Sequence, residues 1–297
     1  MTSIFRLRNV TQWLYVLPAL LFVVVFVYYP AVDNLRLSLF QWSSFSPKES
    51  FVGLQNYRDL AADPIFWSAL FNNIAYAVVS VIVQVGGGLV LAAILEEFVR
   101  PRLRGFFRTV LFLPAVMSLT VVGFLFYFLY EPNFGLVNQA LNAVGLGSLT
   151  HAWLGEEGTA IWSIITMSQW QSTGYVMVLF IVAIQKIPRE LYEAAYIDGA
   201  TKVEAFRRIT VPLVNDMLVL MLIVTVSGAF LVFNEVWVMT QGGPNNASHT
   251  LWTWLYKSAF FNDQLGYAAA IGSVIFVITF VTSIIQLRLA RGRSVQF

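Results

Sequence analysis

The chain contains long stretches without a charged residue, and they constrain its fold more than any other feature. A helix rises 1.5 Å per residue, so about 20 apolar residues cross the roughly 30 Å of hydrocarbon in a bilayer. Six stretches approach or exceed this length. They are Trp13 to Val32, Asp63 to Glu96 with its most apolar part at Ala69 to Leu95, Arg108 to Glu131, Glu157 to Lys186, Asp216 to Glu235, and Asp263 to Arg288. The sequence therefore predicts an all-α, polytopic integral membrane protein with six transmembrane helices.

The composition excludes several other classes of protein. Hydrophobic residues make up 58% of the chain and charged residues 11%, whereas soluble domains carry about 25% charged residues. So few charges do not cover the surface of a soluble enzyme, and they do not fit a disordered tail or a nucleic-acid binder. The chain has no cysteine, and its two histidines, His151 and His249, are far apart in sequence. We therefore expect neither a disulfide nor a metal site.

Two more uncharged stretches are poor candidates for spans because they are rich in turn residues. They are Pro132 to Gly155 and Val236 to Tyr256, which contains GGPNNAS. Backbone groups exposed to lipid must be paired within their own segment, which turn-rich sequence does not achieve. We expect both stretches to form outer loops with short interfacial helices.

The basic residues orient the chain in the membrane. Fourteen of the 18 lysines and arginines fall on one side of the six predicted spans. They are Arg6, Arg8, Arg100, Arg102, Arg104, Arg108, Lys186, Arg189, Lys202, Arg207, Arg208, Arg288, Arg291 and Arg293. The other side holds Arg36, Lys48, Arg58 and Lys257. Because lysine and arginine concentrate in cytoplasmic loops, both termini are predicted to be cytoplasmic.

The chain lacks the parts of a self-powered transporter. None of its lysines follows the glycine pattern of a phosphate-binding P-loop, so we expect no ATP site of that kind. The predicted spans also lack the series of carboxylates that a proton or sodium relay uses. We expect no catalytic residues, and we expect the energy for uphill transport to come from another subunit.

Polar residues concentrate in the fourth and fifth predicted spans. The fourth contains SQWQSTGY, Ser168 to Tyr175, in which Gln171 and Tyr175 share a helix face and Trp170 is adjacent. The fifth offers a second polar set. Its members are Thr225, Ser227, Gly228, Asn234 and Glu235. Aromatic rings beside amides and hydroxyls suit a sugar, but such groups also hold neighbouring membrane helices together, and both interpretations stay open.

The segment between these two spans predicts a compact helix–turn–helix. Pro188 suits a helix start, and Gly199 suits a helix end with a positive φ. Thr201 and Glu204 have the spacing of a capping box for a second helix. Ala194 and Ala195 form a small-residue knob that a partner's backbone can approach closely. An amphipathic helix lying on the lipid surface is the alternative.

This segment resembles the EAA motif of permease subunits in bacterial ATP-binding-cassette (ABC) importers. The resemblance rests on LYEAAYIDGA (Leu191 to Ala200) and on Ile209 to Leu213, where Val211 stands in place of the usual leucine. Other strings in the same order resemble the maltose/oligosaccharide branch of sugar importers. They are FVGLQNY (Phe51 to Tyr57), FRTVLFLP (Phe107 to Pro114), QGGP (Gln241 to Pro244) and the run from Ala259 to Ala270.

The resemblance implies a type I ABC importer permease fold, with residues 1–297 as one transmembrane permease domain and 186–212 as its cytoplasmic coupling loop. It implies that this loop docks on an ATPase subunit through Glu193, Ala194, Ala195, Asp198 and Gly199. The implied partners are a second homologous permease, two ABC ATPases, an extracytoplasmic solute-binding protein and membrane lipid. ATP and magnesium would be bound by the ATPases, and the location would be the bacterial inner membrane.

The resemblance also implies that sugar binds on the helices that flank the loop. The matching positions are Trp170, Gln171, Ser172, Tyr175, Thr225 and Gly228, to which we add Asn234 and Glu235 from their position near the outer end. Permeases for glycerol 3-phosphate or a polyol look similar and form the alternative. An anion would favour a lysine or arginine within the spans, and the sequence places none there. The less favoured alternative is an ion-coupled secondary transporter. Such a protein would need repeats or broken helices around an ion site, and the sequence shows no convincing repeat.

Overall fold

Four helices of the computed structural model, which describes residues 15–290, are long and apolar enough to cross a membrane. They are Tyr15–Leu37, Pro64–Glu97, Ala160–Ile184 and Leu265–Arg288. Two bent pairs pass the same test, Pro101–Val116 with Leu119–Leu129 and Lys202–Leu213 with Asn215–Phe230. Counting each pair as one span gives up to six, which confirms the predicted helical membrane fold. Trp13 and the terminal arginines (Arg6, Arg8, Arg291 and Arg293) lie outside the described residues.

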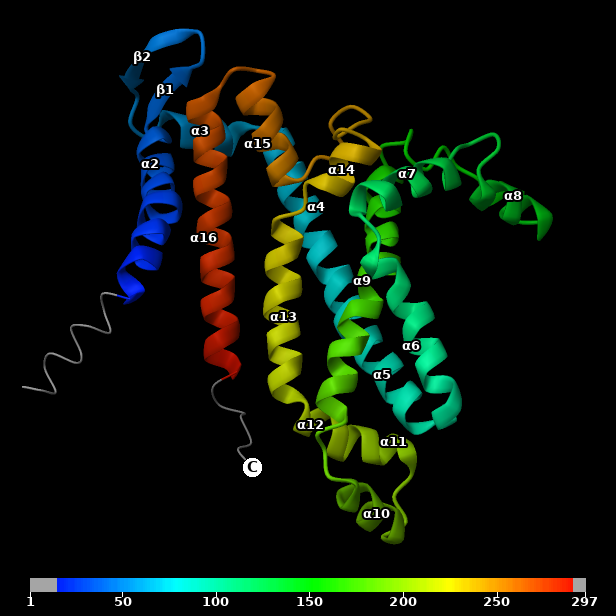
Figure 1. Ribbon diagram of the computed structural model, residues 1–297. Coiled ribbons are helices and arrows are strands. Elements are labelled where there is room, and N and C mark those ends of the chain that lie inside the picture. Colours follow the sequence, from blue (N-terminus) through cyan, green and yellow to red (C-terminus); the bar gives the residue numbers. More distant parts are fainter. Residues whose placement is uncertain (1–14, 291–297) are drawn as a thin grey trace, which may run out of the picture. The chain divides into compact units, whose positions relative to one another are not determined.

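The internal contacts divide the chain into two units, and the first combines its beginning with residues 255–274. Its elements are η1 (Val24–Tyr28), α2 (Tyr29–Leu37), β1 (Phe40–Ser43), β2 (Ser46–Phe51), α3 (Gln55–Ala62), the end of α15 (Leu251–Phe260) and the first part of α16 (Leu265–Ala290) (Figure 1). The antiparallel hairpin of β1 and β2 was not predicted. Asn56 explains part of its stability, because Nδ2 donates to the Ser38 and Phe40 carbonyls at 2.8 and 2.9 Å.

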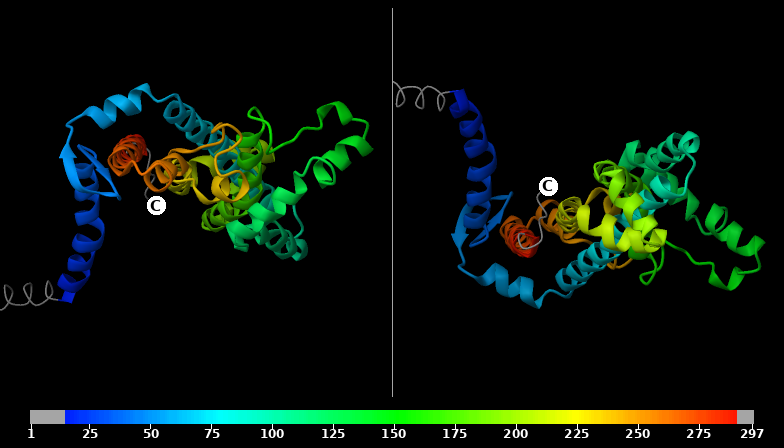
Figure 2. Two further views of the ribbon diagram at one scale, coloured as in Figure 1. Left: turned by 90° about the horizontal axis from the view of Figure 1, so that it is seen from above. Right: turned by 90° about the horizontal axis from the view of Figure 1, so that it is seen from below.

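The second unit contains the remaining helices. They are α4 (Pro64–Ser80), η2 (Val81–Gly87), α5 (Gly88–Glu97), α6 (Pro101–Val116), α7 (Leu119–Leu129), α8 (Leu136–Ala143), η3 (Gly147–Leu149), α9 (Ala160–Ile184), α10 (Arg189–Ile197), α11 (Lys202–Ala205), η4 (Phe206–Thr210), α12 (Val211–Leu213), α13 (Asn215–Phe230) and α14 (Asn234–Met239), and the last part of α16 joins them. Viewed from above and below, α8 projects away from α9 and α13 of this unit (Figure 2).

Helix α9 lies at the centre of the second unit and is buried on several faces. This burial is expected, because apolar residues occur on all sides of the helix. Two apolar clusters form along it. The α5 cluster joins Leu89, Met177, Phe180, Val214 and Met221 with their neighbours. The α14 cluster joins Tyr76, Val122, Ile164, Ala229 and Val236 with theirs. The two clusters share no buried residue of the described chain.

The third predicted span, Arg108 to Glu131, is wrong as a single helix. Helices α6 and α7 meet at an angle of 95°, with Met117 in an extended conformation at the break. Gln171 of α9 donates its Nε2 to the Met117 carbonyl at 3.1 Å, which pairs one backbone group that the break leaves unbonded. The break is therefore stabilised by a side chain from another span, because lipid offers no water to replace the missing hydrogen bond.

Helices α6 and α9 approach so closely that one position between them requires glycine. A Cβ atom on Gly174 would lie 1.9 Å from the Leu111 carbonyl oxygen and 3.1 Å from the Phe112 Cα. These are backbone atoms, so a side chain there cannot be accommodated by a rotamer change. The packing of α6 on α9 depends on this missing methyl group.

Replacing Gly174 by alanine is expected to force these helices apart and to destabilise the protein by about 1–3 kcal/mol, the usual cost of overpacking. Thermal unfolding of the detergent-solubilised protein measures the loss. The matched control is Gly105→Ala on α6, where a Cβ would meet no atom within 4 Å. Equal melting temperatures for the two variants would contradict the close approach.

Candidate functional site

A cavity of about 240 Å³ lies among the helices of the second unit. Helices α4, η2, α9, α13 and α14 contribute its walls. The lining residues are Tyr76, Ser80, Gln84, Ser168, Ser172, Tyr175, Val176, Met221, Val224, Thr225, Gly228, Ala229, Val232 and Glu235. Residues of the α5 cluster and of the α14 cluster both border it. Hydroxyl, amide and carboxylate groups therefore face one space between two apolar clusters.

Five of the eight predicted sugar-binding residues line this cavity. They are Ser172, Tyr175, Thr225, Gly228 and Glu235. The structure thus brings together the polar sets of the fourth and fifth predicted spans. Ser168, which belongs to the same polar run as Ser172, is a further lining residue.

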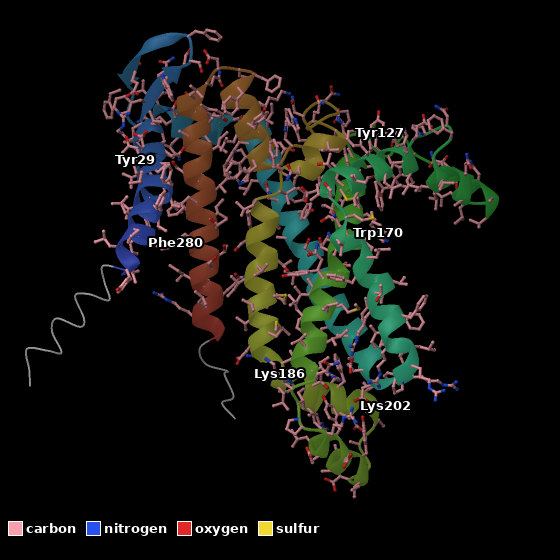
Figure 3. All side chains as sticks on the ribbon, in the orientation of Figure 1. Tyr29, Tyr127, Trp170, Lys186, Lys202 and Phe280 are labelled. Carbon is pink, nitrogen blue, oxygen red and sulfur yellow. The ribbon has the colours of Figure 1, made fainter. Side chains whose placement is uncertain are left out.

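The other three predicted residues do not line the cavity. Trp170, which Figure 3 labels, is 45% exposed. Its ring contacts that of Phe126 at a centroid distance of 5.3 Å. Gln171 is buried and bonds the Met117 carbonyl at the break between α6 and α7. Asn234 is exposed at the start of α14. Helical spacing put Gln171 and Tyr175 on one face, but it does not say which neighbour each side chain reaches.

A third wall of the cavity, which was not predicted from the sequence, comes from α4 and η2. Tyr76 donates its hydroxyl to Glu235 Oε1 at 3.1 Å. Gln84 Nε2 and Gln169 Nε2 both lie within hydrogen-bonding distance of Ser80 Oγ, at 3.2 and 3.3 Å. Tyr76, Ser80 and Gln84 recur at intervals of four, so a polar stripe on the second span was the available signal.

Two asparagines of α4 bond the backbone next to the cavity. Asn73 donates to the Ala229 carbonyl at 2.6 Å and accepts from the Leu251 amide at 2.8 Å. Asn72 donates to the carbonyls of Ala247 and His249, each at 2.8 Å. Ala247, His249 and Leu251 belong to the predicted outer loop, so part of this loop packs against α4. His249 and Leu251 are fully buried. These bonds hold the end of α13 and the segment after α14 against α4.

The predicted helix–turn–helix is confirmed in its local structure. Pro188 is the N-cap of α10, and Gly199 follows that helix with φ at +84°. Thr201 and Glu204 form the predicted capping box at α11. In Figures 1 and 3 this segment, with Lys186 before it and Lys202 within it, lies at the end of α9 opposite α14. The ends of its helices are set by ordinary capping chemistry.

The residues predicted to dock on a partner lie largely at the surface of this segment. Glu193, Ala194, Asp198 and Gly199 are exposed, and Ala195 is half-buried. Ile197 is 86% exposed, which is unusual for an isoleucine in a helix. Residues 193–199 therefore present small and apolar side chains together with two carboxylates, Glu193 and Asp198.

Glu97 at the end of α5 ties this segment to the rest of the unit. Its Oε2 accepts the Tyr196 hydroxyl at 3.0 Å, and its backbone carbonyl accepts Lys202 Nζ at 3.0 Å. Lys202 Nζ also lies 4.4 Å from the centre of the Phe98 ring. Burial and the bond to Glu97 raise the pKa of Tyr196 to about 12, so its hydroxyl stays a donor at neutral pH. We call this group of interactions the Glu97 contact.

Glu96, the neighbouring carboxylate, anchors the same end of the unit. It pairs with Arg104 at 3.3 Å and with Arg108, and Gln185 of the α9 end lies 3.5 Å from it. Its side chain is only 12% exposed, so these partners offset the cost of burying its charge. The turn between α5 and α6 is therefore a rigid support for α10.

Replacing Tyr196 by phenylalanine removes only the hydroxyl that reaches Glu97. The lost bond is partly exposed, so we expect a loss of roughly 0.5–1 kcal/mol and a two- to fivefold faster amide exchange across residues 189–197. Hydrogen–deuterium exchange with mass spectrometry measures this change. Glu193→Gln on the same helix is the control. Unchanged exchange in Tyr196→Phe would show that the Glu97 contact does not hold α10.

The comparisons with known proteins agree with this arrangement. Residues 84–295 match the family described as "Binding-protein-dependent transport system inner membrane component". The probable ABC transporter permease protein YurN of Bacillus subtilis (strain 168) is 53% identical over 281 residues, which cover 95% of this chain and 96% of that protein. The lactose transport system permease protein LacF of Rhizobium radiobacter is 36% identical over 298 residues, which cover 99% and 98%.

A solved structure shows the same fold. It is the crystal structure of a bacterial alginate ABC transporter in complex with its alginate pentasaccharide-bound periplasmic protein, one chain of which has a TM-score of 0.83 and 21% identity, covering 96% of this chain and 95% of that one. The match of the family extends over most of the chain and includes the cavity walls from Gln84 onward and the segment around Ala195. The chain therefore belongs to the family of binding-protein-dependent transport system inner membrane components, and it is a membrane permease.

Proposed function

We propose that this chain is one permease subunit of an ATP-driven sugar importer in a bacterial plasma membrane and that it forms half of the translocation pathway. The observation that carries the proposal is the polar cavity among the spanning helices, in a chain that belongs to a binding-protein-dependent transport family. The relative LacF is named as a lactose transport system permease protein, which supports a sugar as the solute. Both termini would be cytoplasmic, and the whole chain would act as one permease domain.

The proposed sugar site is the cavity itself. Ser172, Thr225 and Glu235 offer hydrogen-bonding groups, and the ring of Tyr175 offers an apolar face for C–H groups. Gly228 leaves room beside them. Trp170, Gln171 and Asn234, which lie off the cavity, stay predictions for this role. An anionic solute such as glycerol 3-phosphate is disfavoured, because no lysine or arginine is among the lining residues that the structure describes.

The proposed coupling surface is the segment around Ala195, where Glu193, Ala194, Asp198 and Gly199 would dock on an ABC ATPase. The ATPase pair would bind ATP and magnesium, and its closure would move the docked segments. A second permease and a solute-binding protein would complete the importer, in line with the periplasmic protein named for the alginate transporter. Movement would pass from α10 to the spans through the Glu97 contact.

Replacing Ala195 by tryptophan is expected to block docking, because the larger ring occupies the space that a small side chain leaves for the ATPase. Membrane insertion is expected to stay normal, and ATP turnover stimulated by solute-loaded binding protein is expected to fall to the background rate. Leu146→Trp, an exposed position far from this segment, is the control. Normal stimulation of ATP turnover in Ala195→Trp would contradict the assignment of this segment as the docking site.

The cavity is tested by removing two hydroxyls from its wall. Ser172→Ala with Thr225→Val is expected to lower sugar uptake by roughly tenfold, since each lost hydrogen bond is worth about 0.5–1.5 kcal/mol. Uptake into proteoliposomes that hold the complete importer measures the effect. Thr166→Val, on the exposed face of α9, is the matched control. Unchanged uptake together with a lowered melting temperature would favour the alternative that these groups only hold helices together.

A further inference from the structure

Glu235 differs from every other residue that lines the cavity. It is the only acidic residue among the fourteen, and those lining residues include no lysine, arginine or histidine. The residue is 9% exposed, so its carboxylate is largely removed from water. A single side chain of the described residues donates to it, the Tyr76 hydroxyl at 3.1 Å.

Tyr76 does not neutralise this carboxylate. A hydroxyl donor stabilises the ionised form of a carboxylate, but it supplies no positive charge to pair with it. The ion pairs found within residues 15–290 involve Asp33, Glu49, Glu96 and Glu156, and none involves Glu235. Buried charges in proteins are otherwise paired, because desolvation of an unpaired charge costs several kcal/mol.

A solute with a positive charge would supply the missing partner. An ammonium group placed against the carboxylate forms a charge-assisted hydrogen bond, which is about twice as strong as a neutral one. The remaining wall is suited to hydroxyl groups, because Ser168, Ser172, Thr225, Gln84 and Ser80 all line the cavity. The cavity therefore has a polyol-binding wall and one acidic position.

We propose that Glu235 makes this permease selective for polyhydroxylated solutes that carry a protonated amine, such as an amino sugar or a sugar-substituted amine. The amine binds the Glu235 carboxylate, which Tyr76 orients, and the hydroxyls bind the serines and Thr225. The same carboxylate repels acidic sugars. This inference rests on the proposed sugar site and names the substrate class of that site.

The test measures direct binding to the assembled permease and ATPase complex in nanodiscs, without the binding protein, so that the selectivity of that protein does not intervene. The probes are glucosamine, glucose and N-acetylglucosamine, titrated by saturation-transfer NMR. N-acetylglucosamine carries the nitrogen substituent without the charge. We expect glucosamine to bind about tenfold more tightly than the other two, the effect of one charge-assisted hydrogen bond.

Glu235→Gln keeps the size of the side chain and removes its charge, and it is expected to bring the three affinities within about twofold of one another. Glu157→Gln is the matched control, an exposed glutamate outside the cavity that accepts from Asn245. This control is expected to keep the tenfold preference. If Glu235→Gln does not fold, the order of the three affinities in the unaltered protein still tests the amine preference, and its absence would overturn the inference.

The outcomes separate this inference from the proposed function. Equal affinity for glucosamine and glucose in the unaltered protein would overturn the amine selectivity and leave a sugar site in place. A preference for glucosamine that persists in Glu235→Gln would overturn the assignment to Glu235. Failure of all three probes to bind would overturn the cavity as a sugar site and the inference with it.

Discussion

The structure depends on one constraint, which is that a polar backbone group inside a lipid-embedded helix bundle needs a partner from the protein. Two irregular stretches of the second unit have such a partner. Gln171 bonds the carbonyl of Met117 where α6 breaks from α7. Asn72 and Asn73 bond the backbone around residues 229–251. Amide side chains on α4 and α9 therefore allow the neighbouring segments to depart from regular helix.

The same constraint explains which parts of the fold could be predicted from the sequence. The four long helices could be predicted from the length of the apolar stretches, because the length of a span depends only on hydrocarbon thickness and helix rise. Local chemistry gave the N-cap at Pro188, the positive φ of Gly199 and the capping box of Thr201 and Glu204. The break at Met117 was not predicted: Pro114 precedes it and Ser118 follows it, but the amide that stabilises it lies more than 50 positions away.

The candidate site was predictable by residue type and less so by geometry. Polar residues of the fourth and fifth predicted spans do meet in one cavity, with Ser172, Tyr175 and Thr225 on its wall. Gln171 and Trp170 belong to the same polar run, yet they lie against α6 and α7. A single sequence does not show whether a membrane amide bonds a solute or a neighbouring backbone, since both uses need the same group. Tyr76 was missed because it lies within a strongly apolar span.

The separation of the α5 cluster from the α14 cluster has a thermodynamic consequence for the cavity between them. When apolar packing is lost, water that enters the gap does not restore its free energy. When a hydrogen bond within the protein is exchanged for one with water or with a hydroxylated guest, the free energy changes little. Side chains at this level can thus swap partners while each cluster keeps its own contacts. The bundle is malleable at its polar midsection and stiff at both ends, so small guests of different shapes can be admitted at low energetic cost.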